Sequence, residues 1–180
     1  MTRVWKPLTK KPRRRFLRSE RGSVAIEFAL TAIPFFALMF AIFEAGMVFF
    51  VNAELDNALN DAGRLIRTGQ AQTANMTAEQ LLQRVCDDVV MVTNCTENVK
   101  IDVRTYTSFG NVTFPSPVDA NGNLTNSFQF NMGNAGDIVL IRIFYVWDIM
   151  SPLPTGLSGG NGSSRLIQSS VAFRNEPYTS

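Results

Sequence analysis

The segment from Ser23 to Val51 constrains the fold more than any other part of the sequence. It contains 29 residues, of which only Glu27 and Glu44 are charged. About 20 apolar residues are enough for a helix to cross the hydrocarbon core of a bilayer, so the run predicts a transmembrane helix over 23–51. It is too long for the apolar region of an ordinary secretory signal, and no small-residue cleavage site follows it.

The charges on either side of this segment are unequal. Residues 1–22 contain nine basic residues and one acidic residue, a net charge of +8, whereas the rest of the chain has a net charge of −6. A basic stretch directly before an apolar span is typical of the cytoplasmic flank of a membrane helix. We therefore expect a cytoplasmic leader over 1–22 and no nucleic-acid partner, with the chain from about residue 52 onward on the other side of the membrane.

The helix is expected to continue beyond the membrane over 52–69. In this stretch apolar residues recur at spacings of three and four, which is the period of an amphipathic helix. These residues are Leu55, Leu59, Ala62 and Ile66, following Val51. Gly69 provides a stop, and Pro34 is expected to kink the helix inside the membrane. A helix over 22–68 would be on the order of 70 Å long.

Residues 70–180 are expected to form a small head. A polar link over 70–76 leads to a second helix, which opens with a possible capping box of Thr77 and Gln80 and ends near Met91.

Beyond the second helix the period changes to two, which indicates strands. The segment 99–106 predicts a half-buried strand, 127–131 a short strand, and 164–176 a last strand. The segment 137–149 is apolar on both faces, which is typical of a central strand covered on both sides, here by the second helix and the long N-terminal helix. The fold class is therefore α+β with an antiparallel sheet.

Few residues in this chain could support catalysis. There is no histidine, the commonest general base and metal ligand, and Lys100 is the only lysine beyond the leader. We therefore expect no enzyme, no cofactor and no metal, and we interpret Asp119–Asn123 as a turn rather than a calcium loop.

Cys86 and Cys95 lie in the exported part of the chain, with eight residues between them. An even pair of cysteines in an oxidising compartment predicts a disulfide. The alternative is two free, buried thiols.

The start of the apolar run carries a recognisable pattern. After the basic leader, Gly22 is followed by four residues, then Glu27 and an aromatic residue. This pattern resembles the processing site of type IV prepilins. The resemblance implies cleavage between Gly22 and Ser23 by a prepilin peptidase, and it makes Glu27 an assembly carboxylate that neutralises the new α-amine of a neighbouring subunit. Each charge is costly alone in hydrocarbon and much less costly when paired.

Further motifs narrow the resemblance. The sequences "RGSVAIEFALTAIPFF", "CDDVVMVTNC" leading into "VKIDVRTYTSF", and "AFRNEPY" near the C-terminus together resemble TadE-like pseudopilins of tight-adherence (Tad, Flp) pilus systems of bacteria. The resemblance implies a pilin-like fold and a single-pass protein of the inner membrane with a periplasmic head. It implies a role in priming or assembling an adhesive pilus. Its partners would be the lipid bilayer, other pilins or pseudopilins, and the inner-membrane assembly platform.

Several alternatives stay open. The chain could instead be an uncleaved, membrane-anchored scaffold or ligand-binding domain. Glu44 lies about 100° around the helix from Glu27 and either extends to the outer interface or pairs with another group. Arg174, Asn175 and Glu176 either dock a partner subunit or only complete the sheet.

Overall fold

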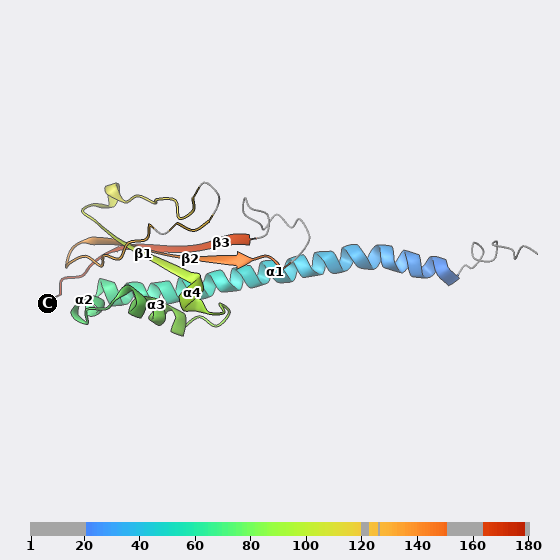
Figure 1. Cartoon of the computed structure of the whole chain (residues 1–180), viewed down its shortest axis with the longest axis horizontal. Coiled ribbons are helices and arrows are strands. Elements are labelled where there is room, and N and C mark those ends of the chain that lie inside the picture. Colours follow the sequence, from blue (N-terminus) through green and yellow to red (C-terminus); the bar gives the residue numbers. More distant parts are fainter. Residues whose placement is uncertain (1–20, 120–122, 126, 151–163, 179–180) are drawn as a thin grey trace, which may run out of the picture. The chain divides into compact units, whose positions relative to one another are not determined.

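The computed structural model describes residues 21–119, 123–125, 127–150 and 164–178. The chain divides into two compact units, residues 1–40 and residues 41–180. In the first unit the described residues, 21–40, are all helical. The second unit is the head, and it contains the rest of the long helix, further helices and a sheet (Figure 1). This is the α+β class that the sequence predicts.

The long helix α1 runs from Arg21 to Arg67, close to the predicted bounds of 22–68. Pro34 lies inside it. The helix ends before Gly69, whose φ of 77° is left-handed and suits a residue without a Cβ. Arg64 and Arg67 lie in the last turn, where their positive charges interact favourably with the negative end of the helix dipole.

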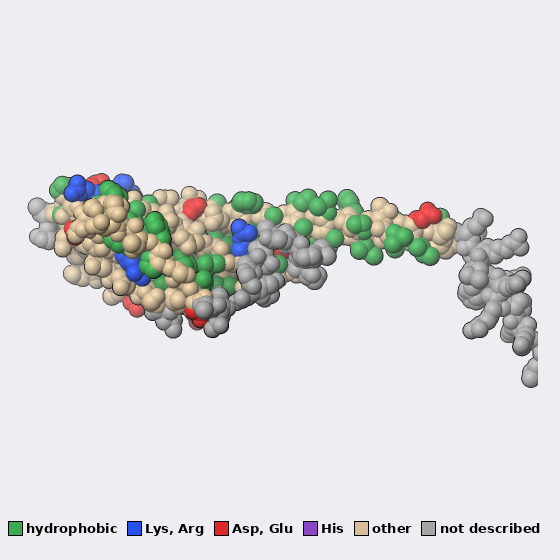
Figure 2. Space-filling model, turned by 90° about the horizontal axis from the view of Figure 1, so that it is seen from above, with side chains coloured by type: hydrophobic (Ala, Val, Ile, Leu, Met, Phe, Trp, Pro, Cys, Tyr) green, Lys and Arg blue, Asp and Glu red, His purple; other side chains and the backbone are tan. Residues whose placement is uncertain are grey.

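The apolar side chains of the first unit are exposed. Apart from Met39, the large apolar residues between Val24 and Phe40 have exposed fractions from 47% to 71%, and Figure 2 shows hydrophobic side chains along this part of α1. Helix α1 contains an 18-residue window with a mean hydropathy of 2.1, and it is the one described helix that is long and apolar enough to cross a membrane. The structure is thus consistent with a membrane anchor.

The sheet has three antiparallel strands in the order β1-β2-β3. Strand β1 covers Val99–Tyr106, β2 covers Ile138–Asp148 and β3 covers Ser164–Arg174. All three match predicted strands, and β2 is central as expected. The short strand predicted over 127–131 is wrong, since only Phe130 forms an isolated bridge, to Val103. One reason is that the Gln129 N–H donates to the Asp102 carboxylate, so this backbone donor cannot take part in strand pairing.

One face of the sheet packs against α1 and helix α3 (Ala78–Asp87) (Figure 1). The core there joins strand residues with α1 and α3, and its fully buried members include Leu55, Leu59, Ile66, Leu81, Val85, Val103, Val139, Ile141 and Ile143. A Cβ at Gly63 would lie 3.2 Å from the Phe173 ring, so the absence of a side chain lets α1 approach the sheet closely.

The sequence predicts that the second helix and the long helix together cover both faces of β2, and this prediction is wrong. Both helices lie on one face, and the opposite face, with Leu140, Arg142 and Phe144, is buried beneath the segment between β1 and β2. The Phe128 ring stacks on Phe144 at 5.5 Å between centroids, and the Pro115 carbonyl accepts a hydrogen bond from Arg142. This segment also contains the 3₁₀ helix η2 (Phe109–Asn111).

The short helices depart from the predicted bounds. The link over 70–76 contains α2 (Gln70–Thr73), and α4 spans Cys95–Asn98. Helix α3 opens with the predicted capping box of Thr77 and Gln80, but it ends at Asp87 rather than near Met91. At this end the Val89 N–H donates to the carbonyl of Cys86, three residues back, instead of continuing the α-helical bonds to residues four back. Beyond it, Val89 and Val92 are buried and Val90 is exposed.

Candidate functional site

The predicted processing and assembly residues lie in the first turns of α1. Gly22, Ser23 and Glu27 are all helical and exposed. A Cβ at Gly22 would meet no atom within 4 Å. The Thr31 hydroxyl donates to the backbone carbonyl of Glu27, so it does not engage the carboxylate. The structure thus leaves the Gly22–Ser23 bond and the Glu27 side chain on the helix surface.

Glu27 is the only charged residue from Gly22 to Phe43. Around it, apolar side chains are exposed on every side of the helix. A helix that is hydrophobic all round requires either lipid or other protein around it. A carboxylate on such a surface costs about 2.5–3.5 kcal/mol in a bilayer unless a partner neutralises it.

Glu44 is in a different environment from Glu27. It lies in the head unit, is only 4% exposed, and its Oε1 accepts a hydrogen bond of 2.6 Å from the Met150 N–H. Glu44 continues the stripe of Val48, Val51 and Leu55 that α1 packs into the core. This acid therefore belongs to the fold of the head, where it fastens the end of β2 to α1.

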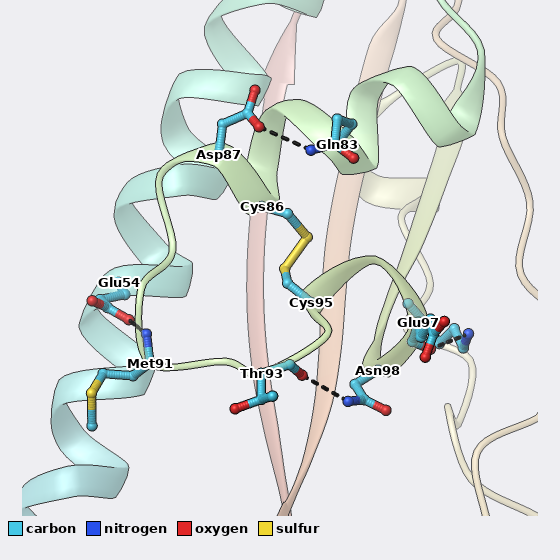
Figure 3. Close-up of a disulfide and its surroundings, with 10 residues drawn as sticks. Glu54, Gln83, Cys86, Asp87, Met91, Thr93, Cys95, Glu97 and Asn98 are labelled. Carbon is cyan, nitrogen blue, oxygen red and sulfur yellow. Dashed lines mark hydrogen bonds between the residues drawn. A yellow bond between two sulfur atoms is a disulfide. The ribbon is translucent and has the colours of Figure 1, made fainter.

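The predicted disulfide between Cys86 and Cys95 is present and joins α3 to α4, with the two Cα atoms 5.6 Å apart. Figure 3 shows the connecting loop passing beside α1, where the Met91 N–H donates to the Glu54 carboxylate at 3.1 Å. The loop is thus fixed at both the disulfide and α1.

The residues at the end of β3 make contacts within the chain. Arg174 donates to the Gly136 carbonyl. Asn175, 2% exposed, donates from Nδ2 to the carbonyls of Met132 and Asn134. Glu176 forms an exposed ion pair with Arg67 and donates its N–H to the Arg67 carbonyl. These contacts complete the sheet and cap α1, while docking of a partner by these residues stays a prediction.

One buried ion pair is missing from the sequence predictions. Asp102 and Arg142 face each other across β1 and β2, and the Arg142 Nη2 lies 2.6 Å from Asp102 Oδ2. Arg104 also donates to Asp102. Burial raises the pKa of Asp102, but hydrogen bonds from Arg104, Arg142 and the Gln129 N–H outweigh it and hold the pKa below its usual value. The signal available in the sequence is Arg142 itself, a charge in an otherwise apolar central strand.

The described part of the chain holds no cluster of three or more cysteine, aspartate or glutamate side chains that could bind a metal ion. At the predicted turn the Asn123 N–H donates to the Asp119 carboxylate, and Asn121 lies outside the described residues.

Comparison with protein families gives a match to the model for TadE-like protein over residues 22–64, about a quarter of the chain. The segment 22–64 is thus similar to TadE-like proteins. The matched residues begin at Gly22 and continue along α1 almost to its end. No curated protein and no solved structure matches the chain.

The matched segment contains Glu27, Glu44 and the predicted processing residues, but none of the sheet. Glu27 and Glu44 differ in the structure, because Glu27 is exposed and Glu44 is buried in the head. Of the two, Glu27 is the one whose side chain is accessible to another chain.

Proposed function

We propose that this chain is an inner-membrane pseudopilin-like protein that takes part in priming or assembling a Tad pilus. In this proposal its role is structural rather than enzymatic. The leader over 1–22 lies in the cytoplasm and the head lies in the periplasm. The +8 charge of the leader supports this orientation, and so does the disulfide, which suits an oxidising compartment.

The observation that carries the proposal is the exposed apolar surface at the start of α1 with Glu27 as its single charge. An anchor that contacts only lipid gains nothing from a carboxylate there. An unpaired ionised group makes insertion into hydrocarbon less favourable by several kcal/mol. Pilin helices that pack side by side would cover the apolar surface and would bring a partner to Glu27.

The proposed partner of Glu27 is an α-amine. Cleavage after Gly22 would make Ser23 the first residue and place a positive charge at the end of the apolar helix. The amine of one subunit would then neutralise Glu27 of its neighbour, which fixes the axial register between the two helices. Both charges become far less costly once they are paired.

The first test is the N-terminus of the mature protein. Full-length protein isolated from membranes of a host with a prepilin peptidase should begin at Ser23 by N-terminal sequencing. Gly22→Ala should block the cut. Gly46→Ala is the matched control, because a Cβ at either glycine would meet no atom within 4 Å, and it should be processed normally.

A mature N-terminus within residues 1–5 in that host would contradict processing and favour the alternative of an uncleaved, membrane-anchored scaffold. Crosslinking from the Glu27 region to pilin-like partners, after detergent extraction, distinguishes the same two functions. A scaffold without a pilus role should yield no such crosslinks.

A further inference from the structure

The two edges of the sheet differ in how the chain treats them. At one edge, the Val103 N–H of β1 donates to the Gln129 carbonyl, and the Val103 carbonyl accepts from the Asn131 N–H. At the other edge, β3 pairs with β2 residue by residue over Ser164–Arg174, without a bulge. The chain thus covers the middle of the β1 edge itself, whereas no described segment pairs with the outer side of β3.

Hydrogen bonds around β3 show which of its backbone groups face outward. In an antiparallel pair, residues bonded to the neighbouring strand alternate with residues whose groups point away from it. The Asn175 N–H donates to the Asp137 carbonyl, in register with the β2–β3 pairs, so in steps of two Val171 also bonds β2. The β1 side agrees. Val103 bonds away from β2, so its partner Ile141 directs its groups toward β3, where it pairs with Val171.

The outward backbone groups therefore belong to Leu166, Gln168, Ser170 and Ala172. Within the described part of the chain, the N–H and C=O groups of these residues that point away from β2 have no hydrogen-bond partner. The stretch from Leu166 to Ala172 contains no proline, lysine or acidic residue, which are the usual devices that keep an edge strand from pairing with another chain. We call the outer side of these four residues the open edge.

The direction of β3 indicates that the strand it would accept is not a second copy of β3. β3 runs parallel to α1 (Figure 1), since the Ser169 hydroxyl donates to Asp56, and Phe173 lies against Gly63 further along both elements. In an antiparallel pair of β3 strands, the two α1 helices would enter the paired sheet from opposite ends, whereas two chains anchored in one bilayer enter from the same side. A parallel pair of copies at the same height would place like groups opposite each other instead of donors opposite acceptors.

The charges of β3 indicate the chemistry of the strand that fits. β3 contains Arg165 and Arg174 and no acidic residue. Arg174 is exposed and follows Ala172 on the same face of the strand. Its Nε donates to the Gly136 carbonyl, and its Nη atoms bond no other described residue. Opposite charges on neighbouring strands stabilise a pair and like charges destabilise it, so a carboxylate level with Arg174 is favoured.

We infer that the open edge docks an extended segment of a different protein, which adds a fourth strand to the sheet. The segment supplies main-chain N–H and C=O groups to Leu166–Ala172 and a carboxylate to Arg174. In this mode of recognition the main-chain bonds give affinity and the neighbouring side chains give specificity. The identity of the partner as another subunit of the pilus system rests on the proposed function, whereas the open edge does not.

Amide hydrogen exchange tests whether the open edge is occupied. Full-length protein purified in detergent from a host without the pilus system is compared with the same protein in membranes of a host that forms pili, and exchange along β3 is resolved to single residues by mass spectrometry. The amides of Ser169 and Val171, which bond β2, should exchange slowly in both samples. Those of Gln168 and Ser170 should exchange fast in the purified protein and at least about tenfold more slowly in the piliated membranes.

Substitutions on β3 test the same contact by function. Ser170→Pro blocks the open edge without removing a bond to β2, because proline is tolerated where an edge N–H faces outward. The variant should insert and keep slow exchange at Val171, but form no pili. Ser170→Ala is the matched control, because it keeps the N–H, and it should form pili. Arg174→Glu should reduce the slowing at Gln168 several-fold, and Arg174→Lys should retain it.

Four results would overturn the inference. Slow exchange of Gln168 and Ser170 in the purified protein would show that the chain or a second copy covers the edge, and fast exchange in both samples would show that nothing does. Pili formed by a folded Ser170→Pro protein, or equal effects of Arg174→Glu and Arg174→Lys, would contradict the added strand or its carboxylate. If Ser170→Pro does not fold, the exchange of the wild-type protein still decides. Failure of the proposed function is distinct, because it appears as an uncleaved N-terminus or as pili in Glu27→Ala.

Discussion

Replacing Asp102 with alanine should destabilise the head more than any other single change at a polar residue that we consider. The carboxylate is fully buried and accepts hydrogen bonds from Arg104, Arg142 and the Gln129 N–H. Without it, Arg142, which is 2% exposed, keeps a buried charge with no counter-ion. Breaking a buried pair in this way costs about 3–5 kcal/mol.

The assay is equilibrium unfolding of the full-length protein in detergent, followed by near-ultraviolet circular dichroism of the head. Asp61→Ala is the matched control, because Asp61 is exposed on α1 and its loss should change the free energy of unfolding by less than about 0.5 kcal/mol. The double variant Asp102→Ala with Arg142→Met removes both charges. It should be more stable than Asp102→Ala alone, by at least about 1 kcal/mol, because no charge stays buried unpaired.

The pair also predicts a dependence on pH. The pKa of Asp102 is lower in the folded protein than its usual value, so its contribution is complete above the unfolded pKa of about 3.9 and is lost as the pH falls through the folded pKa. The difference in unfolding free energy between wild type and Asp102→Ala should thus be constant above about pH 5 and should shrink below about pH 4. Two results would refute the reasoning. One is a decrease in unfolding free energy below about 1 kcal/mol for Asp102→Ala at neutral pH; the other is a decrease in the double variant equal to the sum of those in the two single variants.

Two further changes test the contacts of the head, by the same unfolding assay. Cys86→Ser with Cys95→Ser opens a loop with a sequence separation of 9 and should lower the free energy of unfolding by about 2–3 kcal/mol; an unchanged value would show that the loop is held by its other contacts alone. Gly69→Ala should cost more than Gly136→Ala, although both glycines have left-handed φ, because a Cβ at Gly69 would overlap the Tyr178 ring and one at Gly136 would meet nothing within 4 Å. The left-handed backbone conformation accounts for about 1–2 kcal/mol at either position. Equal losses of unfolding free energy in the two variants would therefore contradict the packing of Tyr178 against Gly69.

Local patterns predicted most of the fold. The end of α1 at Gly69 follows from the helical period and a glycine stop, and the three strands follow from alternation or from a continuous apolar run. The disulfide followed from compartment and cysteine number alone. These features depend on neighbours in the sequence, which is why sequence patterns could identify them.

The features that were missed depend on contacts between distant residues. Asp102 looked like a solvent-facing residue of a half-buried strand, and its burial depends on Arg142, forty positions away, and on the segment that covers that face of the sheet. Glu44 looked like a residue at the membrane surface, but the end of β2 returns to cover it. The short strand over 127–131 failed for the same reason, since a carboxylate on β1 takes one of its backbone donors.

The central claim is that Glu27 serves assembly rather than anchoring. The most direct measurement is pilus formation by a strain that carries Glu27→Ala in place of the wild-type protein, with membrane insertion measured in parallel by resistance to carbonate extraction. Thr31→Ala is the matched control, since it removes a polar side chain one turn along the same helix, where the hydroxyl bonds only the backbone carbonyl of Glu27. The account predicts that both variants insert, that Thr31→Ala makes pili, and that Glu27→Ala makes none. Normal piliation by an inserted Glu27→Ala protein would contradict it.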